Sequence, residues 1–86
     1  MRLREEVTLT PIGAEWAVLL DERKGRYYQL NPTAYALLRL LLDGAAPEQA
    51  AARLVDWCPD AAGRAERDTA GLVAYLTGAG LLWDEG

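Results

Sequence analysis

The hydrophobic pattern changes its period at Asn31-Pro32, and this change constrains the fold of the 86-residue chain more than any other feature. Before it, short β-favouring runs alternate with turns. After it, apolar residues recur every three or four positions, as on one face of a helix. Asn accepts hydrogen bonds from the first N–H groups of a helix, and Pro suits the first helical position. The sequence therefore predicts a single α+β domain over residues 1–86, with strands first and helices after.

Three strands are expected before the switch, at about 7–10, 15–20 and 26–30. Pro11-Ile12-Gly13 should end the first strand. The second, Trp16 to Leu20, carries apolar residues on both faces, as is typical of a central strand covered on both sides. The charged segment from Asp21 to Lys24 predicts a solvated hairpin tip, and Gly25 suits a left-handed turn position. We expect an antiparallel meander in which the third strand lies at the edge.

Three helices are expected after the switch, at about 32–43, 47–58 and 61–77. Gly44 should end the first helix in a left-handed turn. Pro47 should begin the second and Pro59 end it, with Asp60 capping the third. The single cysteine, Cys58, is expected to be a small core or boundary residue.

Composition excludes most catalytic chemistry. The chain has no histidine and one cysteine, so it lacks the imidazole of Ser–His–Asp and Cys–His catalysis and the usual ligands of zinc. We therefore expect a protein that is not an enzyme and needs no metal or cofactor. The net charge of −4 and the pI near 4.6 argue against nucleic acid and favour a basic partner. No apolar run is long enough to span a bilayer and the start is no signal peptide, so we expect a cytoplasmic protein.

One face of the third helix carries an unusual glycine. Arg64, Asp68, Gly71 and Tyr75 follow each other at three- or four-residue spacing and share a stripe. Gly71 costs about 1 kcal/mol relative to Ala at a mid-helix position. Close approach of another backbone is the usual reason for such a glycine. The alternative is that the third helix simply packs on the sheet at that point.

The third strand offers a matching edge. An edge strand presents unpaired N–H and C=O groups that can accept an extended peptide beside a helix that supplies side-chain contacts. Tyr28 alone, in phase with Leu30, is better explained as a core aromatic. The candidate peptide-binding residues are Arg26, Tyr27, Tyr28, Gln29 and Leu30 on the strand, and Arg64, Arg67, Asp68, Gly71, Leu72 and Tyr75 on the helix. No catalytic or metal-binding residue is proposed.

The run from Leu19 to Thr33, with Gly25-Arg26-Tyr27-Tyr28-Gln29-Leu30-Asn31-Pro32 at its centre, resembles the PqqD family, also called RiPP recognition elements. Leu40 to Gly44 and the stretch from Leu72 to Leu82 fit the same family. The resemblance implies a winged helix-turn-helix of three strands and three helices. It also implies that the chain binds the leader segment of a ribosomally made precursor peptide, as an antiparallel strand added to the third strand against the third helix.

As a free-standing domain, the chain looks most like the recognition protein of split lasso-peptide systems, whose leaders carry a Tyr-x-x-Pro motif. The implied partners are the precursor peptide, a separate cysteine-type leader protease and an ATP-dependent cyclase, with the chain itself a monomer. Pyrroloquinoline quinone biosynthesis is the sibling alternative.

Two other classes stay open. A winged helix suggests a DNA-binding module, but Arg64, Glu66, Arg67 and Asp68 at the start of the third helix sum to zero charge. An obligate structural subunit would expose a large contiguous apolar patch.

Overall fold

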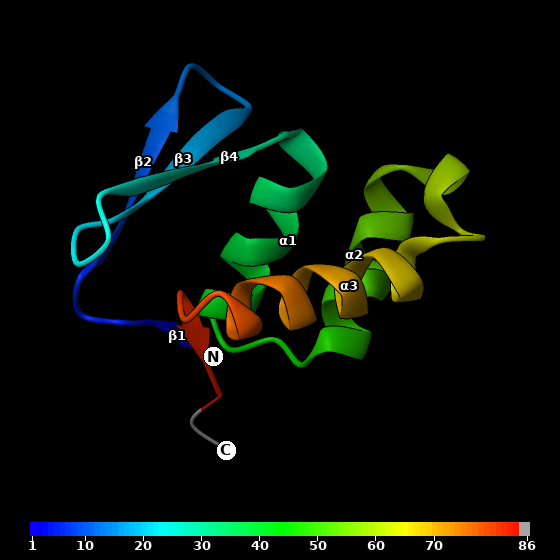
Figure 1. The fold of residues 1–86 in the computed structure, drawn as a ribbon. Coiled ribbons are helices and arrows are strands. Elements are labelled where there is room, and N and C mark those ends of the chain that lie inside the picture. Colours follow the sequence, from blue (N-terminus) through cyan, green and yellow to red (C-terminus); the bar gives the residue numbers. More distant parts are fainter. Residues whose placement is uncertain (85–86) are drawn as a thin grey trace.

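The computed structural model describes residues 1–84. A three-stranded antiparallel sheet in the order β2-β3-β4 is followed by three helices that lie together on one of its faces (Figure 1). The strands are β2 (Val7–Ile12), β3 (Trp16–Asp21) and β4 (Arg26–Leu30), and the helices are α1 (Pro32–Leu42), α2 (Pro47–Trp57) and α3 (Ala65–Gly78). The predicted α+β winged helix-turn-helix is confirmed.

The change of period at Asn31-Pro32 works as the sequence predicts. The Asn31 side-chain Oδ1 accepts a hydrogen bond of 2.8 Å from the backbone N–H of Ala34, and Pro32 begins α1. A cap of this kind stabilises a helix by about 1 kcal/mol. α1 thus begins directly after β4, and this short connection fixes the direction in which the helices leave the sheet.

α1 lies between two cores. The sheet–helix core joins the inner face of the sheet to α1, α3 and the C-terminal strand; it contains Val7, Ala17, Leu19, Leu30, Leu38, Leu76, Leu81 and Leu82. The helix–helix core joins the three helices; it contains Leu37, Leu40, Leu41, Ala50, Ala51, Leu54, Ala61 and Ala65. Since α1 contributes to both, the sheet and the helical layer are held in one body.

A second, two-stranded sheet joins the start of the chain to its end and was not predicted. β1 (Arg2–Leu3) pairs antiparallel with β5 (Leu82–Trp83), so that Arg2 faces Trp83. The Arg2 guanidinium lies 4.9 Å and the Arg4 guanidinium 5.7 Å from the centre of the Trp83 ring. Figure 1 shows this pair near the end of α3, below the main sheet. They anchor the segment that follows α3.

Five of the six predicted elements differ from the structure at a boundary, β3, α1 and α2 by one residue only. β2 continues through Pro11 to Ile12, because β2 is an edge strand where a residue without an N–H is tolerated. α2 ends at Trp57, and residues 59–61 form a short 3₁₀ turn, η1 (Pro59–Ala61). α3 therefore begins only at Ala65, and Arg64 rather than Asp60 occupies its N-cap position.

Two side chains lie where the sequence did not predict them. Asp21 is fully buried rather than in a solvated hairpin tip, and its Oδ1 accepts a hydrogen bond of 3.1 Å from the Arg23 N–H. Its position at the end of β3, in phase with the buried Ala17 and Leu19, accounts for this. Cys58 is exposed rather than in the core, because α2 ends one residue before it.

The prediction that β3 is covered on both faces is wrong. Ala17, Leu19 and Asp21 are fully buried beneath the helices, whereas Trp16, Val18 and Leu20 alternate with them and face away. No helix described for residues 1–84 covers that second face. None of the helices in this part of the chain is long and apolar enough to cross a membrane.

Candidate functional site

β4 is an edge strand, as predicted. Among residues 1–84 it pairs only with β3, from Ala17 opposite Leu30 to Asp21 opposite Arg26. The backbone groups of β4 that point away from β3 therefore have no strand partner in this part of the chain. Five residues in extended conformation span about 17 Å, which is enough to pair with a short peptide strand.

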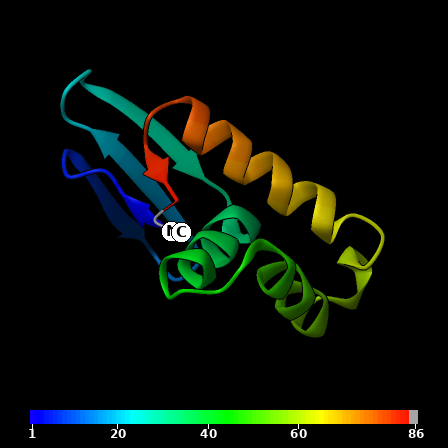
Figure 2. The same cartoon turned by 90° about the horizontal axis from the view of Figure 1, so that it is seen from below.

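α3 runs past the β4 side of the sheet, as Figure 2 shows. The two elements meet where the Tyr28 ring of β4 contacts the Tyr75 ring of α3 edge-to-face, with centroids 6.2 Å apart and planes inclined by 72°. Tyr75 is 60% exposed. Tyr28 is half-buried and packs against the sheet–helix core. The expectation that Tyr28 is a core aromatic and its assignment to the site are therefore compatible.

The space beside Gly71 is open. A Cβ atom placed on Gly71 would have no neighbouring atom within 4 Å. The alternative in which α3 packs directly on the sheet at this glycine is therefore wrong. Gly71 lies one helical turn before Tyr75, on the stripe that points away from the cores. The chain thus has a helix-weakening residue next to open space, close to the point where α3 meets β4.

Leu72 connects this stripe to the interior. It is partly buried and packs against both the sheet–helix core and the helix–helix core. Its neighbour Gly71 is exposed. The side of α3 opposite the stripe therefore packs in both cores. This packing holds the stripe in a fixed position, as a binding surface requires.

Two of the charged residues at the start of α3, Arg64 and Asp68, form an ion pair. The Arg64 Nε lies 3.3 Å from an Asp68 carboxylate oxygen, and its guanidinium also donates a hydrogen bond of 3.2 Å to the Asp60 carbonyl. Arg64 and Arg67 line a shallow hollow toward α2, together with Glu48. The structure thus brings Tyr28 and Tyr75 together, and it places the two arginines nearer to α2.

The remaining predicted residues are divided between the two faces of β4. Leu30 is buried in the sheet–helix core, in phase with Tyr28. Tyr27 and Gln29 are exposed, and the alternation of a strand puts their side chains on the opposite face of the sheet. Arg26 is exposed at the hairpin end of β4. Only the backbone of these residues shares a common edge.

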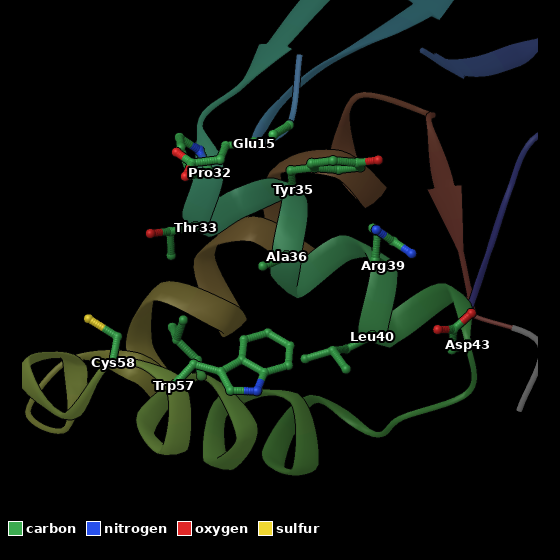
Figure 3. A pocket seen from close by; sticks show the side chains of 12 residues that line it. Glu15, Pro32, Thr33, Tyr35, Ala36, Arg39, Leu40, Asp43, Trp57 and Cys58 are labelled. Atoms are coloured by element: carbon green, nitrogen blue, oxygen red, sulfur yellow. The ribbon is translucent and has the colours of Figure 1, made fainter. Parts of the chain in front are cut away.

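A hollow that was not predicted lies elsewhere on the surface. It has a volume of about 680 Å³ and lies between α1, α2 and the turn after β2 (Figure 3). Tyr35, Arg39, Leu40 and Trp57 are among the side chains that line it. None of the eleven predicted site residues does. The one residue in the sequence that could have indicated this hollow is Trp57, which is 61% exposed. A tryptophan at this position is equally typical of the end of an amphipathic helix. Residues 1–84 hold no group of three side chains suited to bind a metal ion.

Comparison with known proteins gives two kinds of match. The PqqD family, described as "Coenzyme PQQ synthesis protein D (PqqD)", matches residues 17–82, which include β4 and α3. Two solved structures are similar. One, "Lasso peptide synthetase B1 complexed with the leader peptide", has a TM-score of 0.78 and 36% identity over 96% of both chains. The other, "TbiB1 in Complex with the TbiA(beta) Leader Peptide", has a TM-score of 0.82 and 22% identity over 100% of both chains. No curated protein matches the sequence.

Proposed function

The chain belongs to the PqqD family, and on that premise we propose that it binds the leader segment of a ribosomally synthesised precursor peptide during lasso-peptide maturation. The observation that carries this proposal is the 36% identity, over 96% of both chains, to a lasso peptide synthetase B1 whose structure contains the leader peptide. Because that similarity covers nearly the whole of both chains, it includes the edge strand β4 and the stripe on α3.

The proposed mode of binding is addition of the leader as an antiparallel strand to β4. The backbone of Arg26, Tyr27, Tyr28, Gln29 and Leu30 would bind the leader backbone, since this edge has no strand partner among residues 1–84. Specificity would come from a wall on α3, to which we assign Arg64, Arg67, Asp68, Gly71, Leu72 and Tyr75. The open space beside Gly71 and the exposure of Tyr75 support this assignment.

The protein acts in this proposal as a receptor rather than a catalyst. It has no histidine, so it lacks the general base of the common hydrolytic nucleophiles. Cleavage of the leader and closure of the ring would be performed by a separate cysteine-type protease and an ATP-dependent cyclase. The receptor would act as a monomer in the cytoplasm, where ribosomal precursors are made.

The alternatives have less support. The family description favours pyrroloquinoline quinone biosynthesis, whereas the solved structure at 36% identity favours lasso peptides. A DNA-binding role would need several free cations along α3, but Arg64 at its N-cap is paired with Asp68 and the helix itself carries one basic residue, Arg67. Phosphate contacts made by Lys and Arg dominate DNA affinity, and the net charge of −4 opposes them.

The direct test is fluorescence polarisation with the labelled leader of a lasso-peptide precursor found in the same genome as this chain. We expect saturable binding that an unlabelled leader competes away and that a scrambled leader does not. A chain that is folded by circular dichroism yet binds neither peptide, or both equally, contradicts the proposed function.

A further inference from the structure

The edge strand β4 carries one charged side chain, Arg26, and it lies on the side of the sheet that faces the helices. Arg26 is directly opposite the buried Asp21 of β3, and residues directly opposite each other in an antiparallel pair share one face of the sheet. Tyr28 and Leu30 are in phase with Arg26. The inner side of β4 therefore carries two largely apolar side chains and then, toward the hairpin, one cation.

The acid opposite Arg26 is already served by another cation. The Asp21 Oδ1 accepts the hydrogen bond from the Arg23 N–H and lies 3.7 Å from the Arg23 Nε. The same Nε lies 3.9 Å from a Glu6 carboxylate oxygen. The Asp21 Oδ2 is buried without a hydrogen bond within residues 1–84, so the Arg26 side chain does not turn inward to it. Arg23 is thus engaged with the body of the protein.

Arg26 has no such partner. Its side chain is exposed, and within residues 1–84 it makes no ion pair and no hydrogen bond. The charges of Glu22 and Lys24 in the adjoining turn balance each other. Arg26 therefore supplies an unpaired positive charge at the hairpin end of the edge to which the proposed leader strand would be added.

A leader strand on β4 would meet this cation at one fixed position. This step rests on the proposed function, in which the leader is antiparallel to β4. The leader then passes Leu30 first, Tyr28 next and Arg26 last. Because alternate residues share a face, the leader residue that faces Arg26 comes two positions after the one that faces Tyr28. It lies on the C-terminal side of the paired segment.

The chemistry of this position favours a carboxylate. The planar guanidinium group of an arginine presents its N–H donors in a fork that matches the two oxygens of a carboxylate. Opposite charges that face each other across two strands stabilise the pairing, and like charges weaken it. The net charge of −4 favours a cationic leader as a whole, but at the position that faces Arg26 the nearest charge is positive.

We propose that Arg26 is a specificity-determining residue that binds an acidic side chain of the leader. The leader class that fits this edge has apolar side chains at two alternate positions, which face Leu30 and Tyr28, and Asp or Glu at the next alternate position. The second apolar side chain also meets Tyr75, because the Tyr75 ring contacts that of Tyr28.

The test is a charge scan of the leader, read by fluorescence polarisation at low salt. The probe is the labelled leader of a lasso-peptide precursor found in the same genome, in versions that carry Glu or Lys at one position at a time. Attraction and repulsion across a strand pair each change affinity by up to about fivefold. The wild-type protein should therefore prefer Glu to Lys at one position by about 5- to 25-fold.

Two variants of Arg26 should change this preference. Arg26→Glu should reverse it, and Arg26→Gln should reduce it to about twofold or less, because no charge then faces the leader. Arg26→Glu puts a second carboxylate opposite Asp21, so circular dichroism melts check its fold, and Arg26→Gln decides the test if that variant is unfolded. Lys24→Glu is the matched control. It makes the same change of charge in the exposed turn outside β4 and should leave the preference as in wild type.

Tyr75→Ala supplies the register. The leader position that contacts the two tyrosines is the one where alanine substitution is non-additive with Tyr75→Ala, since residues in contact show such coupling. The position that prefers Glu should come two residues later.

Three results would overturn the inference. The first is a wild-type protein that prefers Glu at no position, or a preference that folded Arg26→Gln retains in full. The second is a reversal by Lys24→Glu equal to that by Arg26→Glu. The third is a Glu-preferring position that comes before the one coupled to Tyr75. The wild-type chain binds the leader in all three cases, so the proposed function stands, whereas a wild-type chain that binds no leader overturns the proposed function and this inference with it.

Discussion

Replacing Gly71 with Leu should leave the fold of the protein intact and disrupt its binding to the leader peptide. In the free protein a Cβ at this position meets no atom within 4 Å, and the glycine does not have a positive φ. Nothing in the fold therefore opposes a larger side chain. Replacing a mid-helix glycine by leucine gains about 0.8 kcal/mol of helix propensity. For a domain of this size that gain raises the melting temperature by about 3–6 °C.

The same substitution should abolish or severely weaken leader binding. If a peptide strand lies against Gly71, the leucine side chain occupies the space that the peptide backbone needs. Overpacking of a close contact costs about 1–3 kcal/mol, which corresponds to roughly a 5- to 150-fold loss of affinity. Fluorescence polarisation with labelled leader measures this loss, and a circular dichroism melt measures stability on the same preparation.

Ala70→Leu provides the matched control for Gly71→Leu. Ala70 is exposed on the same helix, about 100° around its axis from Gly71, so the same side chain is added outside the stripe. Binding should stay at the wild-type level. The reasoning is refuted if Gly71→Leu binds like wild type, or if it loses binding only because the protein has unfolded. The second result would mean that the loss of binding comes from unfolding and gives no support to a groove beside Gly71.

Three further predictions concern the wall, the charge and the chemistry. Tyr75→Ala removes an exposed aromatic side chain that contacts Tyr28. It should weaken leader binding by about 1–3 kcal/mol and leave the melting temperature nearly unchanged. Arg53→Ala on α2 is the control, and equal leader affinities of the two variants would exclude Tyr75 from the wall on α3. The net charge of −4 should favour a leader that carries Lys or Arg. The affinity for such a leader should fall moderately from low to high salt, because exposed charges are screened over about 8–10 Å. An affinity that does not change with salt would mean that charge attraction contributes nothing to binding. The purified protein should neither cleave nor modify the precursor, and proteolysis that Cys58→Ala abolishes would show that the protein is itself a protease.

The sequence predicted the main elements because their signals are local. The Asn31 cap, the Pro residues at the starts of α1 and α2 and the periodic leucines are each contained within one or two turns. β1 and β5 were not predicted, since each has two residues and the two lie at opposite ends of the chain. A pairing of that kind leaves no periodicity to detect.

The apolar residues of β3 show a different limit of sequence interpretation. Trp16, Val18 and Leu20 indicate that both faces of the strand avoid water, but periodicity does not tell whether the chain's own helices or another protein provides the cover. Asp21 shows the reverse, because its charge predicts exposure whereas its position in phase with Leu19 buries it.

The candidate site was predictable only in part. The stripe on α3 followed from helical spacing, and the edge position of β4 followed from the order of the strands. The approach of Tyr75 to Tyr28 is a tertiary contact between residues 47 positions apart in the sequence, and no local pattern contains it. For the same reason the sequence did not show that Arg64 and Arg67 lie toward α2.

Amide hydrogen exchange, measured residue by residue with and without the leader, tests the central claim most directly. Strand addition should protect backbone N–H groups at alternate residues of β4, those that point away from β3, because alternate residues of an antiparallel strand bond to opposite neighbours. β2, the other edge of the same sheet, provides the internal control and should be unaffected. New protection on β2, or a leader that binds without protecting β4, would contradict the account.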